Sequence, residues 1–99
     1  MTAERREIRS ESKIRRNPQV VARDLASGEG AVLLHLESAQ YHGVNPIGLL
    51  IWELVDGERT VAEIIHALRV RVGSPPPHLE TDVLGFLERI YERDLVVVE

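Results

Sequence analysis

The sequence contains no cysteine, so the residues that could bind a metal or take part in catalysis are its histidines, serines and carboxylates. That absence excludes a disulfide framework, an iron–sulfur cluster and a cysteine nucleophile, and it agrees with a reducing cytoplasm. Zinc sites commonly place two histidines one helical turn apart, and no two histidines here have that spacing. We therefore expect no metal and no cofactor, with His35 partly buried in a strand and His66 and His78 facing solvent.

Nucleotide binding and nucleophilic catalysis are not supported either. Gly28 and Gly30 lie in an expected turn between two strands, without the strand-to-helix context or the Lys-Ser/Thr pair of a phosphate loop. No serine lies in a nucleophile elbow, and no carboxylate pair has neighbours that would raise one pKa for acid–base catalysis. The sequence predicts a protein that is not an enzyme.

Three strands are predicted between residues 20 and 44. Residues 20–25 begin with two β-branched residues and run into the turn residues at 27–30. Residues 31–36 form a short apolar run, typical of a central strand covered on both faces or nearly so. Residues 40–44 are aromatic and half polar and end at Asn45-Pro46, which changes the backbone conformation. They predict an edge strand.

Three helices follow, and their ends are marked by capping residues. Asn45 and Pro46 suit the start of the first helix, and Gly57 suits its end. Thr60 and Glu63 form a capping box for the second helix, which stops at residue 73. The third helix is predicted over residues 78–93, and residues 95–98 form a terminal strand or a docked tail. The order of strands and then helices indicates an α+β fold with a three-stranded antiparallel sheet followed by three helices.

The helices have apolar residues at helical spacing, which predicts their buried sides. The first predicted stripe consists of Ile47, Leu50, Ile51, Leu54 and Val55. The third consists of Leu79, Val83, Phe86, Leu87 and Ile90. Trp52 lies off the first stripe, and we expect it to close the core rather than to contact a ligand.

Charge divides the 99 residues into two parts. Residues 1–16 carry six basic and three acidic side chains, whereas residues 17–99 carry six basic and thirteen acidic ones. We expect residues 1–16 to form a flexible basic extension and residues 17–99 to form one folded domain. No apolar run approaches the roughly 18 residues of a membrane span, so we expect a cytoplasmic protein without a membrane partner.

The second and third helices also resemble a helix-turn-helix, which would be winged if a strand flanked it. The would-be recognition helix is rich in carboxylates, whereas duplex binding needs several basic side chains. Nucleic acid is therefore not an expected partner. A winged-helix DNA-binding or protein-adaptor module remains the alternative function.

A short edge strand at residues 40–44 offers unpaired backbone groups to which an extended peptide can add as a further strand. If the third helix packs alongside, it would form one wall of a groove for alternate peptide side chains. The other interpretation of Tyr41, Val83 and Phe86 is that all three are simply core residues. An exposed edge can equally pair with its own copy, so a homodimer stays open.

Several short blocks of the sequence together resemble the pattern of a protein family. They are Ala31-Val32-Leu33-Leu34, Tyr41-His42-Gly43-Val44, Asn45-Pro46-Ile47-Gly48, Ile51-Trp52-Glu53-Leu54, Asp56-Gly57-Glu58 and Asp82-Val83-Leu84. Over about residues 17–98 this pattern resembles the PqqD family, whose members are also called RiPP recognition elements. The resemblance implies a winged-helix-like fold and a non-catalytic peptide chaperone. Such a chaperone binds the leader of a ribosomally synthesised precursor peptide by strand addition and presents it to a modifying enzyme.

The resemblance also implies the site and the partners. The leader peptide would dock between the third strand and the third helix, against Gln40, Tyr41, His42, Gly43, Asp82, Val83, Phe86 and Arg89. The partner enzyme would be a radical SAM enzyme, a leader peptidase or a cyclase. Two residues depart from the family pattern, namely His42 in place of a second aromatic residue and Asp94 in place of a glycine after the third helix.

Overall fold

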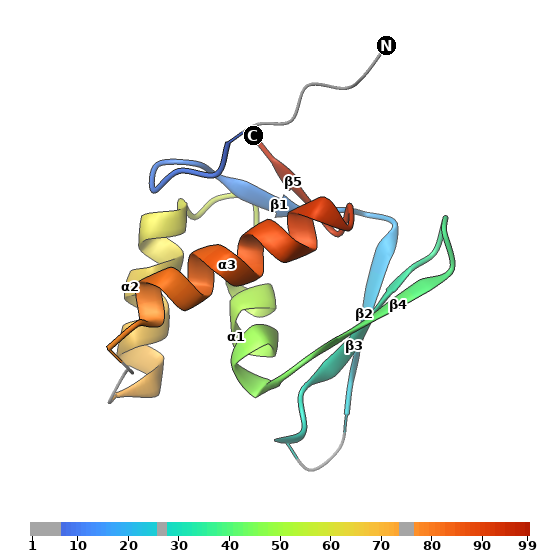
Figure 1. The fold of residues 1–99 in the computed structure, drawn as a ribbon, viewed down its shortest axis with the longest axis horizontal. Coiled ribbons are helices and arrows are strands. Elements are labelled where there is room, and N and C mark those ends of the chain that lie inside the picture. Colours follow the sequence, from blue (N-terminus) through green and yellow to red (C-terminus); the bar gives the residue numbers. More distant parts are fainter. Residues whose placement is uncertain (1–6, 26–27, 74–76) are drawn as a thin grey trace.

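The computed structural model describes residues 7–25, 28–73 and 77–99. A short strand comes first, and the predicted three strands, three helices and terminal strand follow it (Figure 1). The elements are β1 (Ile14–Arg16), β2 (Val20–Asp24), β3 (Ala31–His35), β4 (Gln40–Val44), α1 (Pro46–Leu54), α2 (Val61–Val72), α3 (Leu79–Glu92) and β5 (Val96–Val98). The predicted α+β class is confirmed, and β2 and β3 each end one residue earlier than expected.

The three-stranded sheet is antiparallel in the order β2-β3-β4, so β3 is central and β4 lies at an edge, as predicted. Leu33 of β3 lies opposite Ala22 of β2 and His42 of β4. Leu33 is completely buried on the face that the helices cover. On the other face Tyr41 is 73% exposed. The prediction of a central strand covered on both faces or nearly so therefore holds fully on the helix side, whereas Val32 and Leu34 on the other face are half-buried.

Helix α1 begins as predicted, and Ile51 and Leu54 of the predicted stripe are buried, whereas the start of the stripe is not. The side chain of Asn45 caps the helix by accepting a hydrogen bond from the amide of Gly48 (2.7 Å). Ile47 is 39% exposed, contrary to the predicted stripe, whereas Trp52 is 3% exposed and closes the core. The helix ends at Leu54, and Gly57 follows in the next turn with a positive φ of 82°.

Helices α2 and α3 agree closely with the sequence. Thr60 and Glu63 form the predicted capping box, and Gly73 ends α2 in a left-handed conformation (φ 80°). The stripe predicted for α3 is buried along its whole length. Together with β1, β5 and the inner face of the three-stranded sheet, the helices enclose one core.

Strand β1 corrects the expected domain boundary. Residues 14–16 pair antiparallel with β5, and the side chain of Ile14 is fully buried. Arg16 donates hydrogen bonds to the backbone carbonyls of Trp52 and Glu53 (both 3.1 Å), and its guanidinium lies 5.4 Å from the Trp52 ring centre. The folded domain thus includes residues that were expected in the extension. Residues 1–6 of that extension lie outside the described residues.

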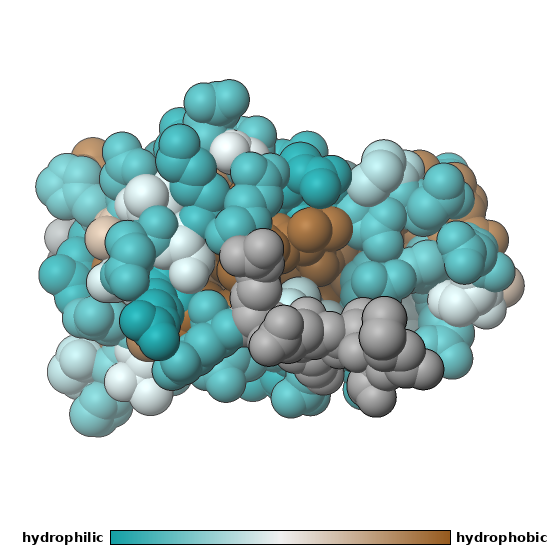
Figure 2. Space-filling view, turned by 90° about the horizontal axis from the view of Figure 1, so that it is seen from above, coloured by the Kyte–Doolittle hydropathy of each residue, from teal (hydrophilic) through white to brown (hydrophobic). Residues whose placement is uncertain are grey.

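Strands β1 and β5 cover the core at the top of the view in Figure 1. Figure 2 shows that this side of the molecule is largely hydrophilic, with an apolar area near its middle. The polar character agrees with the exposed side chains of Arg15 and Arg16 on β1. Arg15 also pairs with Glu99 across the two strands (3.0 Å). This second sheet joins the two ends of the domain.

Candidate functional site

The free edge of β4 is the first part of the candidate site. Among the described strands, β4 pairs only with β3. The amide of Leu36 donates to the carbonyl of Gln19 (2.8 Å), which fixes the alternation between β2 and β3. In an antiparallel pair, the N–H and C=O of one residue point to the same side, and successive residues alternate. Val32 and Leu34 therefore bond toward β2, and Leu33, which lies between them, bonds toward β4.

This alternation identifies the unpaired groups of β4. Leu33 bonds to His42, its register partner, so the backbone groups of His42 are used within the sheet. The N–H and C=O groups of Tyr41 and Gly43 point away from β3 to the open edge. These four groups form a template to which another extended strand can bond.

The predicted strand residues do not form one cluster of side chains. Side chains alternate between the faces of a strand, so Gln40 and His42 point to the helix side, as does Leu33. Tyr41 points to the opposite face, and Gly43 has no side chain. The site residues of β4 thus divide into backbone donors and acceptors at Tyr41 and Gly43 and side chains at Gln40 and His42.

A groove between α1 and α3 is the second part of the site. Its volume is about 390 Å³. Its lining includes all four residues that were predicted on the third helix, namely Asp82, Val83, Phe86 and Arg89. Val83 is fully buried and Phe86 is buried, so both are core residues that also form the floor. The interpretation of Val83 and Phe86 as core residues is therefore confirmed, and their contact with a peptide stays a prediction.

Sequence reasoning missed the groove residues of α1. Ile47 lines the groove, as do Asn45, Gly48 and Ile51. The spacing of Ile47 predicts a buried position, but its side chain is 39% exposed, whereas its neighbour Gly48 is buried. No local pattern marks this difference, since it depends on where α3 crosses α1.

Gly85 is the other missed residue, and it carried a signal. It lies in the middle of α3, where glycine is less favourable than alanine by about 1 kcal/mol. A Cβ atom at Gly85 would meet only the end of the Arg89 side chain, at 3.8 Å. Packing within the protein therefore does not require glycine here, although the residue lines the groove.

The two ends of the groove differ in charge. Asp82 lies toward the start of α3, and Arg89 lies toward its end, with its guanidinium 6.0 Å from the Phe86 ring centre. The side chain of His42 points to the helix side of the sheet, toward the end of α3, where Asp94 contacts His35 of the neighbouring strand. Partial burial, and then the positive charges of Arg93 and Arg89, lower the pKa of His42 from its usual 6.5.

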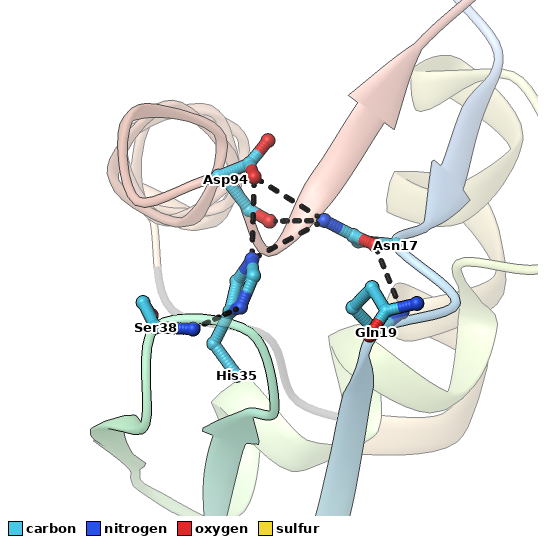
Figure 3. Close-up of polar contacts among 5 residues, drawn as sticks. All are labelled: Asn17, Gln19, His35, Ser38 and Asp94. Carbon is cyan, nitrogen blue, oxygen red and sulfur yellow. Dashed lines mark hydrogen bonds and ion pairs between the residues drawn. The ribbon is translucent and has the colours of Figure 1, made fainter.

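A hydrogen-bond network with the buried His35 at its centre holds the sheet against the end of α3 (Figure 3). The amide of Ser38 donates to Nδ1 of His35 (3.3 Å), so the proton of the neutral ring is on Nε2, which donates to Asp94 Oδ2 (3.2 Å). The side-chain amide of Asn17 donates from Nδ2 to the backbone carbonyl of Asp94 (2.7 Å). The expectation of a satisfied, partly buried His35 is confirmed, and the burial is nearly complete.

Asp94 occupies the position where the family pattern has glycine, and its φ is 62°. Aspartate is among the few residues other than glycine that adopt this left-handed conformation readily. Its carboxylate and carbonyl are both held by the network, which favours the conformation further. The helix therefore ends in the glycine-like manner, and the network joins the end of β3 to Asp94, just after α3.

The comparisons with known proteins agree with this geometry. Residues 30–96 match the family model of coenzyme PQQ synthesis protein D (PqqD). The chain belongs to the PqqD family. No curated protein sequence matches it.

Three solved structures share the PqqD-family fold. TbiB1 in complex with the TbiA(beta) leader peptide has 27% identity and a TM-score of 0.69, over 83% of this chain and 93% of that one. Lasso peptide synthetase B1 complexed with the leader peptide has 19% identity and a TM-score of 0.70, over 86% and 98%. The PqqD truncation of Methylobacterium extorquens PqqCD, described as a stand-alone RiPP recognition element, has 24% identity and a TM-score of 0.68, over 85% and 87%.

Neither a metal-binding cluster nor a membrane-spanning helix occurs in the described part of the chain. Within residues 7–25, 28–73 and 77–99, no three histidine or carboxylate side chains are grouped so that they could hold a metal ion. None of the helices described there is long and apolar enough to cross a bilayer. The candidate site therefore consists of the β4 edge and the groove of α1 and α3.

Proposed function

We propose that this chain is a non-catalytic chaperone for the leader segment of a ribosomally synthesised precursor peptide. The segment adds to β4 as a fourth strand and is presented to a modifying enzyme, such as a radical SAM enzyme, a leader peptidase or a cyclase. The observation that carries the proposal is the open edge at Tyr41 and Gly43, next to a groove that α1 and α3 line. Strand addition supplies affinity through the backbone, and the groove supplies selectivity.

The chemistry of the groove suits a peptide in this position. A strand beside β4 directs every second side chain to the helix side, where Ile47, Phe86 and Gly85 offer apolar surface and space. Each backbone hydrogen bond contributes a net ~0.5 to 1.5 kcal/mol, and each buried apolar anchor contributes about 1.5 to 3 kcal/mol. After the cost of ordering the peptide, these terms support an affinity from sub-micromolar to micromolar, which permits both capture and release.

The solved complexes support the same function. TbiB1, which is 27% identical to this chain, is described in complex with a leader peptide. The alternative of duplex DNA binding is disfavoured by the exposed carboxylates of α3, which include Glu80, Asp82 and Glu88. A salt titration against duplex DNA separates the two functions, since phosphate binding must weaken steeply as the salt concentration rises.

Amide chemical-shift mapping tests the proposal directly. The ¹⁵N-labelled chain is titrated with the leader of a precursor peptide encoded beside it. We expect shifts in residues 40–47 and 79–93, and little change along β2. Shifts that are confined to β2, or a peptide that leaves the spectrum unchanged, would contradict strand addition at β4. Concentration-dependent shifts without any peptide would indicate that a second copy of the chain occupies the edge.

A further inference from the structure

We propose that His42, Arg89 and Arg93 form a subsite for an acidic side chain of the bound segment. The inference rests on the proposed function and specifies which peptides the groove accepts. The subsite lies where the helix side of the sheet meets the end of α3. Asp94, two residues after α3, contacts His35 of β3, and the register partner of His35 is Gln40, two residues before His42. An Asp or Glu of the peptide, on the face of its strand that points to the groove, would place its carboxylate beside the two guanidinium groups and the imidazole of His42.

The first argument is that these arginines lack carboxylate partners. Five ion pairs occur among the described residues, and neither Arg89 nor Arg93 takes part in any of them. Both side chains are exposed, and Arg89 lines the groove. Although Glu88, Glu92 and Asp94 lie in the same stretch of the chain, none of the ion pairs found among the described residues joins them to Arg89 or Arg93.

Second, His42 of β4 is the third member of the subsite, and its side chain points to the helix side of the sheet, as does that of Leu33. Basic residues near a helix C-terminus are favourable by themselves, because they interact with the helix dipole. That effect explains the arginines on α3, but not why β4 carries a histidine opposite them. When protonated, His42 repels both arginines, and a carboxylate in their midst would relieve this repulsion. An anionic ligand therefore gives all three residues one purpose.

The third argument is that the groove discriminates along its length. Asp82 lies seven residues before Arg89 on α3, at about 1.5 Å per residue, so the negative and positive ends are about 10 Å apart. An acidic side chain is repelled at the Asp82 end and attracted at the Arg89 end. Both the carboxylate and the apolar anchor must point to the groove, so they lie an even number of positions apart in the peptide.

A peptide display selection tests the inference without knowledge of the natural ligand. A library of random 12-residue peptides is selected against the full chain, and the enriched peptides are tested against the variant Gly43→Pro, which removes a donor from the β4 edge. We expect peptides that depend on Gly43 to carry an Asp or Glu two or four positions from a large apolar residue. If such peptides have no acidic preference, the subsite is refuted while strand addition stands. If no enriched peptide depends on Gly43, both proposals fail.

A charge swap gives the sharper test. Replacing the acidic residue of a selected peptide by Gln should weaken binding to the unmodified chain roughly fivefold, the effect of one partly exposed ion pair. The Arg89→Glu variant should bind the acidic peptide more weakly than the unmodified chain does. It should bind the version of the peptide with Lys at that position more tightly. Arg71→Glu is the matched control, because it makes the same change of charge at an exposed position of α2. Equal losses in both variants, or no gain with the Lys peptide, would overturn the subsite.

Discussion

The three-stranded sheet has two edges, β2 and β4, and only one of them has the properties of a binding site. The alternation that exposes Tyr41 and Gly43 on β4 also leaves Val20, Ala22 and Asp24 of β2 with outward backbone groups. Strand β2 carries the charged residues Arg23 and Asp24, a common means of blocking strand addition. Strand β4 carries no carboxylate, lysine or arginine.

The two edges also differ in what lies beside them. His42 of β4 faces α3, next to the groove that α1 and α3 line, whereas four of the five residues of β2 are exposed. Open backbone groups alone therefore do not make a site, since both edges have them. A second wall is needed to recognise side chains, and the network of His35, Asn17 and Asp94 holds that wall in place.

Proline substitution at equivalent positions of the two edges should have the largest contrast. Gly43→Pro removes an outward N–H of β4, and we expect peptide affinity to fall about 30- to 100-fold through the lost hydrogen bond and the unpaired peptide carbonyl. Ala22→Pro removes an outward N–H of β2 and should leave affinity unchanged. Isothermal titration calorimetry with a selected peptide measures both. Equal effects would show that the peptide does not distinguish the edges.

A charge introduced into the groove should have the next largest effect. Ile47→Asp changes an exposed side chain of the groove, so we expect a folded protein with about tenfold weaker peptide binding. Val21→Asp, at a similarly exposed apolar residue of β2, is the control and should bind normally. Val83→Asp is a poorer test, because it would bury a charge in the core and unfold the protein. Normal binding by Ile47→Asp would exclude the α1 wall from the site.

Gly85→Ala should separate stability from binding. Alanine favours the helix, so the free energy of unfolding should rise by about 0.5 to 1 kcal/mol in a urea titration. The added methyl group occupies the groove, so peptide affinity should fall severalfold. A variant that is more stable and binds equally well would show that the peptide does not approach this part of α3.

The sequence was sufficient for the elements whose signals are local. The capping residues Asn45 and Thr60 and the stripe of α3 each act within one or two turns, so they located the helices. Strand β1 was missed because its partner β5 lies about 80 residues away, and because Arg15 and Arg16 continue the basic pattern of the N-terminus. Pairing at that distance leaves no periodic trace in three residues.

The site, like the fold, was predictable where its signals are local in the sequence. The edge character of β4 and the groove residues of α3 followed from the sequence and the family resemblance. The contribution of Ile47 and the outward direction of Tyr41 did not, because each depends on which face the helices cover. The glycine at position 85 was a local signal that could have been used, since a glycine inside an amphipathic helix requires a reason.

The smallest expected effect is the pH dependence that His42 contributes. Its folded pKa lies below 6.5, so the folded state binds fewer protons than the unfolded chain between that pKa and about 6.5. The free energy of unfolding should therefore rise with pH across this window, and the full penalty should apply below the folded pKa. His42→Gln should remove this slope, whereas His66→Gln, at an exposed site on α2, should keep it. Urea titrations from pH 5 to 8 measure the difference between each variant and the unmodified chain.

A bound acidic peptide should shift the pKa of His42 in the opposite direction. Its carboxylate raises the pKa of His42, so the peptide should bind more tightly as the pH falls. An affinity for such a peptide that is independent of pH would place the carboxylate away from β4, and the edge would then provide the backbone template without selecting charge.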